Sequence, residues 1–277
     1  MTRASMNQRL RRIAAETVAI VEEGGYQAPS GVWVDLAGAV RSAVDSTRLH
    51  QPNDQLAIGG SNVGAPLVDV TNESTLEAGH RLGAGTAALV FASARHPGGG
   101  FLTGASAQEE DVARASALHA CLNTAPDFYS HHRSERDLRY SNRIIHSPEV
   151  PVFRDDAGTL LDRPYLLSMI TCAAPNLTAI RANQPDLAES VPAIVRSRAL
   201  RVLQVAAAHG HRRLVLGAWG CGVFGNDPAV VAEAFAAALR RVKRFDTVVF
   251  AVLDRTTAAP TYHTFADIIR AEFATSD

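Results

Sequence analysis

The sequence predicts an α/β fold with a largely parallel or mixed sheet covered by helices on both faces. Short apolar segments of the strand type alternate with segments of helical spacing from residue 66 to the C-terminus. Strands separated by helices pair in parallel, and the connecting helices cover the two faces of the sheet. The composition, 47% hydrophobic and 20% charged, is that of a globular protein, and 277 residues are enough to bury a large core.

The first part of the chain is expected to add helices to this fold. Apolar residues recur at helical spacing over residues 6–22, where two glycines stop them, and a second helix is expected over 35–47. The polar segment 48–64 is interpreted as a loop. We therefore expect residues 1–64 to form accessory helices packed on a main domain of residues 65–277.

The main domain is expected to alternate between the two kinds of element. Strands are predicted at residues 67–70, 87–92, 143–146, 152–154, 166–171, 213–217 and 247–253. Helices are predicted at residues 74–82, 107–122, 191–208, 228–242 and 265–273, and a loop at 130–142. Ligands of such sheets bind outside the carboxyl ends of the strands, so the functional site is expected in the loops after the second and sixth strands.

Charge and cysteine content exclude several classes of function. The formal net charge is −1, which argues against a broad basic surface for nucleic acid. Cys121, Cys172 and Cys221 lie far apart without CxxC spacing, so neither a disulfide framework nor a zinc site is predicted. No apolar run approaches the roughly 18 residues of a membrane span, and no signal peptide is apparent. We expect a cytoplasmic protein with no membrane contact.

The first loop contains three consecutive glycines, Gly98 to Gly100, followed by a helix start. Glycines remove side chains that would keep a ligand from the backbone, although a flexible connection is the alternative interpretation. Ser106 suits the N-cap position, and Glu109 three residues later would complete a capping box. Glu110, one position further, has no such structural explanation.

Two adjacent carboxylates limit the chemistry that this helix start can perform. Neighbouring helix residues project about 100° apart, so Glu109 and Glu110 are not expected to flank one bond as paired glycosidase carboxylates do. One carboxyl group would then perform most of the acid–base work while the other holds substrate. A helix N-terminus favours the charged carboxylate, whereas a general acid must hold a proton. Burial would have to raise the pKa of the carboxyl group for it to act as the acid.

The second loop has three glycines before another helix start. Asp227 suits the N-cap and Pro228 the first helical position, so Gly220, Gly222 and Gly225 all lie outside the helix. Such a loop at a helix N-terminus is suited to hold a diphosphate. Phe224 would be exposed at its tip and stack on a ligand ring; a turn with the ring folded inward is the alternative.

This glycine pattern also matches the dinucleotide-binding fingerprint, with Asp254 at the end of the next strand. In a dehydrogenase the third glycine of this fingerprint lies inside the helix, whereas here Pro228 begins the helix after Gly225. This difference argues against a dehydrogenase. Only 23 residues follow Asp254, too few for the remaining strands. No Lys-Ser or Lys-Thr follows the glycines, which excludes a Walker loop.

Together the two loops resemble those of a known enzyme family. The run Gly98-Gly99-Gly100, seven residues, then Gln108-Glu109-Glu110 resembles the GGG-x(6–8)-QEE signature of poly(ADP-ribose) glycohydrolases. The segment 220–226, Gly-Cys-Gly-Val-Phe-Gly-Asn, looks like their diphosphate-binding loop. The segment 70–75, Val-Thr-Asn-Glu-Ser-Thr, adds to this resemblance, which is greatest to the short bacterial type. The resemblance spans residue 66 to the C-terminus.

The resemblance implies a macrodomain-like three-layer α/β/α sandwich with a mixed sheet, extended by the N-terminal helices. It implies release of ADP-ribose from the end of poly(ADP-ribose), in the reversal of ADP-ribosylation during the DNA damage response. Glu110 would protonate the departing ribose 2′-oxygen and then deprotonate the attacking water, while Glu109 would hold ribose hydroxyls. The substrate-binding residues would be Gly98, Gly99, Gly100, Gln108, Gly220, Cys221, Gly222, Val223, Phe224, Gly225 and Asn226.

No metal and no cofactor are expected, and the partners would be ADP-ribose, poly(ADP-ribose) and proteins modified by it, with no direct contact to nucleic acid. We expect a monomer. Two other functions stay open: an ADP-ribose reader without catalysis, and a macrodomain hydrolase of mono-ADP-ribosylated protein or O-acetyl-ADP-ribose. Glu110 separates the reader from the glycohydrolase, because binding alone requires no acid there.

Four other polar residues and one cysteine are expected to have structural or solvent-exposed roles, or to contact the ligand. His131 and His132 are expected to be solvated, because no third metal ligand is apparent. Cys221 is interpreted as a small buried residue and not as a nucleophile. Asn72 and Glu73 would either reach the ligand or cap the next helix.

Overall fold

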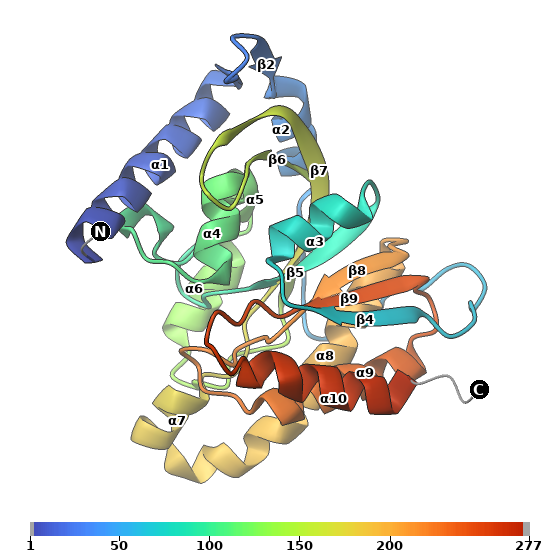
Figure 1. Cartoon of the computed structure of the whole chain (residues 1–277). Helices are drawn as coiled ribbons and strands as arrows, with labels where there is room; N and C mark the ends of the chain where they lie inside the picture. Colours follow the sequence, from blue (N-terminus) through green and yellow to red (C-terminus); the bar gives the residue numbers. More distant parts are fainter. Residues whose placement is uncertain (1–2, 274–277) are drawn as a thin grey trace.

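The computed structural model describes residues 3–273 (Figure 1). Within these residues, a mixed sheet of seven strands has the order β3-β6-β7-β5-β8-β9-β4, and a separate two-stranded sheet pairs β1 with β2. The strands are β1 (Gly25–Gln27), β2 (Trp33–Asp35), β3 (Arg48–His50), β4 (Leu67–Thr71), β5 (Thr86–Phe91), β6 (Ile144–Arg154), β7 (Leu160–Cys172), β8 (Arg213–Leu216) and β9 (Thr247–Ala251).

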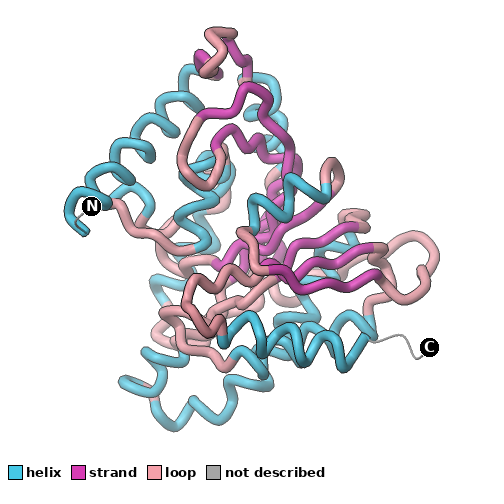
Figure 2. The backbone as a smooth tube through the Cα atoms, viewed as in Figure 1, coloured by secondary structure: helices cyan, strands magenta, loops and turns pink. Residues whose placement is uncertain are grey.

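Helices cover both faces of the large sheet (Figure 2). The α-helices are α1 (Arg3–Glu23), α2 (Ala37–Ser46), α3 (Thr75–Leu82), α4 (Gln108–Ala115), α5 (Leu118–Leu122), α6 (Pro126–Ser134), α7 (Leu177–Asn183), α8 (Val191–Ala208), α9 (Pro228–Arg241) and α10 (Pro260–Phe273). Two 3₁₀ helices, η1 (Phe101–Thr103) and η2 (Pro185–Ser190), join them.

The hydrophobic core divides into two layers, one on each face of the sheet. Successive residues of β5 point to opposite faces. Ala87 and Leu89 belong to a cluster with α8, α9 and α10, whereas Ala88 and Val90 belong to a cluster with α2, α3, α4, α5 and α6. The predicted three-layer α/β/α sandwich with a mixed sheet is therefore confirmed.

Five neighbouring strands, β7, β5, β8, β9 and β4, run parallel to one another, and β6 and β3 run antiparallel to their neighbours. The chain leaves β5 through α4, α5 and α6 toward β6 and β7, but leaves β8 through α9 toward β9. The two connections diverge on either side of adjacent strands. The carboxyl ends of β5 and β8 therefore flank a topological switch point, where ligands of open α/β sheets bind.

Some predicted elements differ from the structure. The helix expected over 107–122 is interrupted, because Ser116 leaves the helix to pair with Val152 of β6. The loop expected over 130–142 begins later than predicted, because α6 continues to Ser134. Proline at its first position and three buried aromatic or imidazole side chains on one face favour this helix.

The N-terminal region contributes more than helices. The expected loop 48–64 begins with β3, which pairs with β6 as an edge strand of the large sheet, Leu49 opposite Ile145. Ile20 of α1 lies in a small core with Phe153 of β6, so α1 shares packing with the large sheet. Between residues 3 and 273, no helix is both long and apolar enough to cross a membrane.

Candidate active site

Two glycine-containing loops meet at the switch point. The first loop, residues 92–107, follows β5, and the second loop, residues 217–227, follows β8. Because β5 and β8 pair in parallel, both loops leave the same edge of the sheet. A Cβ atom on Gly217 would come within 3.0 Å of the Phe91 ring, so the two strand ends are in close contact. The structure thus brings together the two segments that carry the sequence motifs.

In the glycine turn of the first loop, the backbone N–H groups of Gly99, Gly100 and Phe101 are occupied by the protein itself. The N–H of Gly99 donates to the carbonyl of His96 at 3.0 Å, and that of Phe101 donates to Gly98 at 3.3 Å. The N–H of Gly100 donates to Oε1 of Glu110 at 3.0 Å. These N–H groups hold the loop and one carboxylate in place, and are not free to bind an anion.

Glu109 does not form the predicted capping box. The N-cap of α4 is Ala107, without a side-chain cap, and Ser106 bonds to Asp111 instead. Oε2 of Glu109 turns away from the helix and accepts a hydrogen bond from the N–H of Ser93 at 2.6 Å. The carboxylate therefore braces the start of the first loop, which a capping box would have prevented.

The two carboxylates converge on one glycine. A Cβ atom on Gly99 would lie 2.3 Å from Oε1 of Glu110 and 3.1 Å from Oε2 of Glu109. Gly99 has φ +60°, and neither its conformation nor its surroundings suit a larger residue. Although adjacent in the helix, Glu109 and Glu110 therefore both reach the same loop.

The environments of the two carboxylates differ. Glu109 is 2% exposed, and its Oε1 is buried without a hydrogen-bond partner. Burial raises the pKa of Glu109 well above its ordinary value, against the N–H of Ser93, and the nearby charge of Glu110 adds to the increase. Glu110 is only half-buried, and its Oε2 accepts no hydrogen bond within residues 3–273. Glu110 is thus the carboxyl group that a ligand can reach.

Gln108 is part of the scaffold and was expected to bind substrate. Its Oε1 accepts from the N–H of Phe91 at 2.8 Å, while Nε2 donates to Leu89 O at 2.8 Å and to Thr75 Oγ1 at 3.1 Å. Both amide hydrogens are used in this way. The side chain ties the start of α4 to β5 and α3, which fixes Glu109 and Glu110 relative to the sheet.

The second loop leaves three consecutive backbone donors free, although the N–H groups of Cys221 and Gly225 on either side of them are hydrogen-bonded within the loop. Among residues 3–273, the N–H groups of Gly222, Val223 and Phe224 donate to no hydrogen-bond acceptor. A Cβ atom on Gly222 would meet no atom within 4 Å, so packing does not require glycine there. Three consecutive free N–H groups beside the N-terminus of α9 form a site suited to a pyrophosphate.

Phe224 is not the exposed tip that the sequence suggested. Val223 occupies the tip and is 82% exposed, whereas Phe224 is half-buried against the core cluster of α8 and α9. The carbonyl of Phe224 accepts from the N–H of Thr178 at 3.0 Å, which fixes its backbone to α7. Part of the Phe224 ring still remains accessible to a ligand.

Two further residues of the second loop support it from within. Asn226, expected to bind substrate, is 3% exposed and donates from Nδ2 to the carbonyl of Pro175 at 2.9 Å. A Cβ atom on Gly220 would lie 2.4 Å from that Nδ2 and 2.6 Å from Ala174. Asn226 and Gly220 thus lock the loop onto the end of β7.

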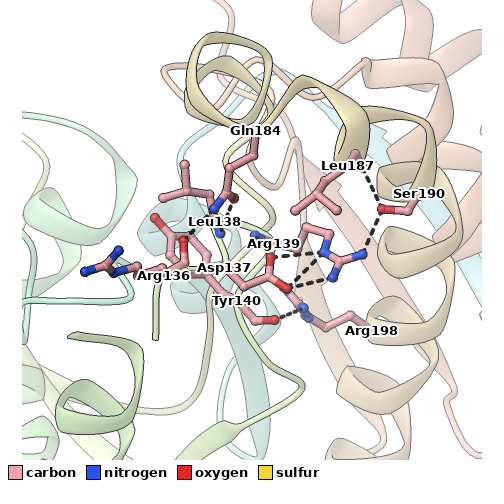
Figure 3. A network of polar contacts seen from close by, with 9 residues as sticks. All are labelled: Arg136, Asp137, Leu138, Arg139, Tyr140, Gln184, Leu187, Ser190 and Arg198. Carbon is pink, nitrogen blue, oxygen red and sulfur yellow. Dashed lines mark hydrogen bonds and ion pairs between the residues drawn. The ribbon is translucent and has the colours of Figure 1, made fainter. Parts of the chain in front are cut away.

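Tyr140 is a site residue that the sequence analysis missed. Its ring centroid lies 6.3 Å from that of Phe224. Its backbone has φ +60°, and its carbonyl accepts from Nη2 of Arg198 at 3.2 Å. A polar network holds the segment around it against η2 and α8, with the Asp137–Arg139 ion pair at 2.7 Å (Figure 3). An aromatic residue within a polar stretch was the available signal.

Other candidate residues take structural roles. Burial raises the pKa of Cys221 to about 12, so the thiol is not prepared for nucleophilic attack. His132 is buried in α6 and not solvated as expected; its Nε2 shares a hydrogen bond with Ser141 Oγ at 2.7 Å. Burial, together with His131, lowers the pKa of His132 to about 4.

The loop after β4 caps α3 through Ser74, and not through Asn72 or Glu73. Ser74 is the N-cap and forms a capping box with Glu77. Asn72 exchanges two hydrogen bonds with the backbone of Asp254, at 3.1 and 2.9 Å, and Glu73 pairs with Arg81. In the part of the chain that the structure describes, no group of three or more His, Cys, Asp or Glu could hold a metal ion.

Comparison with known proteins agrees with this geometry. Residues 14–155 match the family described as "Microbial-type PARG, catalytic domain". No curated protein matches the chain. The structure is similar to that of poly(ADP-ribose) glycohydrolase from Thermomonospora curvata, with TM-score 0.89 and 49% identity over 94% of this chain and 99% of the other.

Two ligand complexes are also similar. The Thermomonospora curvata enzyme bound to the inhibitor ADP-HPD has TM-score 0.86 and 48% identity, covering 94% of this chain and 99% of the other. The poly(ADP-ribose) glycohydrolase from Deinococcus radiodurans in complex with ADP-ribose has TM-score 0.78 and 40% identity, covering 86% and 99%.

Proposed function

Because the chain belongs to the family of microbial-type poly(ADP-ribose) glycohydrolases, we propose that its two loops hold the terminal ADP-ribose unit of the polymer for hydrolysis. The chain is an enzyme that hydrolyses ribose–ribose O-glycosidic bonds in poly(ADP-ribose). The observation that carries the assignment of the site is that the accessible carboxyl group of Glu110 and a row of free N–H groups lie on two loops that leave the same edge of the sheet at one switch point.

Glu110 acts as general acid and then as general base. Its Oε1 is fixed by the N–H of Gly100, which leaves Oε2 to face the substrate. Protonated Glu110 gives its proton to the departing 2′-oxygen while the bond from that oxygen to the anomeric carbon breaks. The carboxylate then takes a proton from the water that attacks the anomeric carbon. The products are ADP-ribose and a polymer shortened by one unit, with a free 2′-hydroxyl.

Glu109 assists from the interior. Its buried Oε1 has no partner, and it is the atom that would accept a hydrogen bond from a hydroxyl of the distal ribose. Gly98, Gly99 and Gly100 would lie along this ribose, because the absence of side chains lets it approach both carboxyl groups.

The second loop binds the pyrophosphate. The N–H groups of Gly222, Val223 and Phe224 supply the hydrogen bonds, and the positive end of the α9 dipole adds favourable electrostatics. Phe224 and Tyr140, whose rings are 6.3 Å apart, would contact the adenosine part of the ligand. Gln108, Cys221, Gly220, Gly225 and Asn226 act by positioning these groups.

The cellular setting is part of the proposal. All three cysteines are free, which agrees with a reducing cytoplasm. The enzyme would act as a monomer on poly(ADP-ribosyl)ated proteins, without direct contact to nucleic acid. Residues 1–64 would form an accessory region of the catalytic domain 65–277.

The test compares wild type with Glu110→Gln for ADP-ribose release from purified polymer. We expect the variant to lose at least ~10² in rate, the typical size of an acid–base contribution, while its ADP-ribose affinity by calorimetry is retained. Asp111→Asn is the matched control, because it changes an exposed acid in the same helical turn and should keep activity.

Each alternative has its own outcome. A wild type that binds ADP-ribose but releases none would be a reader. Release from O-acetyl-ADP-ribose but not from polymer would identify an ester hydrolase. Equal rates for wild type and Glu110→Gln would remove Glu110 from the mechanism.

A further inference from the structure

Four histidines from three parts of the chain meet in one group, which we call the histidine cluster. His50 is the last residue of β3, His146 lies in β6, and His209 and His211 belong to the turn between α8 and β8. The Nε2 atoms of His50 and His209 are 2.9 Å apart, and those of His146 and His211 are 2.8 Å apart. The rings of His146 and His209 stack with their centroids 3.7 Å apart, which joins the two pairs.

The environment of the cluster favours neutral rings. His146 is 2% exposed and His211 is 9% exposed, whereas His50 is half-buried and His209 is exposed. Burial and the neighbouring histidines lower the pKa of His146 to about 2, and burial also lowers the pKa of the other three. The carbonyl of Gly85, which accepts a hydrogen bond from His211, acts in the opposite direction on that residue.

The short contacts between the rings also require neutral histidines. In each pair one Nε2 donates and the other accepts, so a single proton lies between the two nitrogens. In the inner pair, a second proton on Nε2 would bring two N–H groups face to face at 2.8 Å. The Nδ1 of His146 offers no better place, because it is buried without a hydrogen-bond partner. Proton uptake therefore disrupts the contacts that hold the cluster together.

Charged groups on the neighbouring elements do not compensate for a positive cluster. Besides burial and His209, Arg201 of α8 opposes protonation of His50, whereas Asp54 favours it. Two arginines next to cluster members in the sequence bind other groups: Arg48 the carbonyls of Asp45 and Thr47, and Arg212 the carboxylate of Asp246. In the part of the chain that the structure describes, no carboxylate forms an ion pair with any of the four histidines.

The cluster attaches a short edge strand to the end of a helix. β3 has three residues and pairs only with β6, and the chain forms no α-helix or β-strand from residue 51 to residue 66. Arg201 donates to the carbonyls of Gln51 at 2.7 Å and Asp54 at 3.0 Å. Residues 48–54 thus depend on β6, on the packing of Leu49 against the core, and on their contacts with α8 and the cluster.

We infer that the histidine cluster is an acid-sensitive switch that holds residues 48–54 in place while its rings are neutral and releases them when the rings take up protons. The inference goes beyond the proposed function and does not depend on it. An unfolded histidine has a pKa of about 6.5, which is above the lowered pKa values in the folded cluster. The stabilisation is therefore fully present above pH 6.5, and it is lost as the pH falls from there toward the folded values.

The test follows amide hydrogen exchange of residues 48–54 at pH 7 and pH 5 in wild type and in the double variant His50→Gln/His209→Gln. The protection factors of wild type should fall at least about tenfold relative to those of β5 and β8, since each released histidine contributes up to about tenfold per pH unit below 6.5. The double variant should lose at least about threefold less, because glutamine keeps hydrogen-bonding groups without a titrating ring.

His263→Gln is the matched control, because His263 lies exposed on α10 and its ring contacts Tyr262 and none of the cluster histidines. This variant should behave as wild type at both pH values. ADP-ribose release at pH 7 should be the same for all three proteins, because the cluster shares no residue with the first or second loop. A failure of the proposed function would thus appear as no release by wild type, whatever the exchange experiment shows.

Four results would overturn the inference. The first is equal protection of residues 48–54 in wild type at both pH values. The second is a double variant that loses as much protection as wild type. A fall of the same size throughout the sheet would mean that acid unfolds the whole domain and not this segment. Titration of all four imidazoles near pH 6.5, followed by NMR in wild type, would show that folding does not keep the cluster neutral.

Discussion

The loop after β5 and the loop after β8 both contain three or more glycines and both precede a helix, yet they use their N–H groups in opposite ways. In the first loop the N–H of Gly100 holds Glu110, and the N–H of Ser93 holds Glu109. In the second loop the N–H groups of residues 222–224 have no acceptor among residues 3–273. The first loop therefore holds two carboxyl groups in place, whereas the second loop offers hydrogen-bond donors to an anion.

The helix starts follow the same division. The first turn of α4 contains Glu109, Glu110 and Asp111, and no side chain caps it. The first turn of α9 contains no acid, and Asp227 caps it through the N–H of Ala229. Carboxylates at the α4 terminus would repel a phosphate, whereas the α9 terminus attracts one. One ligand can therefore be oriented by its charge, with sugar at α4 and pyrophosphate at α9.

The largest expected effects come from placing the same methyl group in each loop. Gly222→Ala should leave the unfolding free energy almost unchanged and weaken ADP-ribose binding about tenfold, about 1.4 kcal/mol, because the methyl group meets only ligand. Gly99→Ala should lose about 1–2 kcal/mol of stability from its left-handed backbone alone and displace Glu110, so that activity falls as well. Urea unfolding and calorimetry measure the two quantities. A stability loss in Gly222→Ala as large as that in Gly99→Ala would contradict the distinction.

The second prediction concerns the stability cost of the buried acid. Burial raises the pKa of Glu109 in the folded protein above the pKa of the same side chain in the unfolded chain. The contribution of Glu109 to the free energy of unfolding is therefore fully present below its unfolded pKa, and it is lost as the pH rises through its folded pKa. Glu109→Gln removes this dependence. The variant should have a higher Tm than wild type at pH 8, and the difference should vanish near pH 4. A difference in Tm that is independent of pH would show that Glu109 is not the source.

The smallest expected effect separates two identical sequence patterns. Ser74-x-x-Glu77 forms a capping box, whereas Ser106-x-x-Glu109 does not. Ser74→Ala should therefore cost about 1 kcal/mol of stability, and Ser106→Ala less than about 0.5 kcal/mol. Thermal unfolding of the two variants measures the difference. Equal losses would mean that both serines contribute equally to their helix starts.

The sequence predicted the architecture because alternating strands and helices leave few arrangements. It also placed both loops correctly at strand ends, since the glycine runs interrupt strong hydrophobic patterns. It could not predict the partner of Glu109, because a capping motif does not reveal whether the carboxylate turns to its own helix or to the N–H of Ser93. That choice depends on contacts between distant segments.

The same limit explains the other differences. His132 appeared solvated among charged neighbours, but α6 turns it into the core beside Phe128. Val223, and not Phe224, is the exposed tip of the second loop, because Phe224 packs on the core that α8 and α9 build. Tyr140 stood out only as an aromatic residue within a polar stretch, and its proximity to Phe224 arises only in the folded chain. Local sequence determines the element, whereas tertiary packing determines the direction of each side chain.

A crystal structure of the Glu110→Gln variant with ADP-ribose tests the division between the loops most directly. We predict pyrophosphate oxygens within hydrogen-bond distance of the N–H groups of Gly222, Val223 and Phe224, and the anomeric carbon of the distal ribose beside residue 110. A pyrophosphate bound against Gly98 to Gly100, or a ligand at the opposite edge of the sheet, would contradict the assignment of acid to one loop and anion to the other.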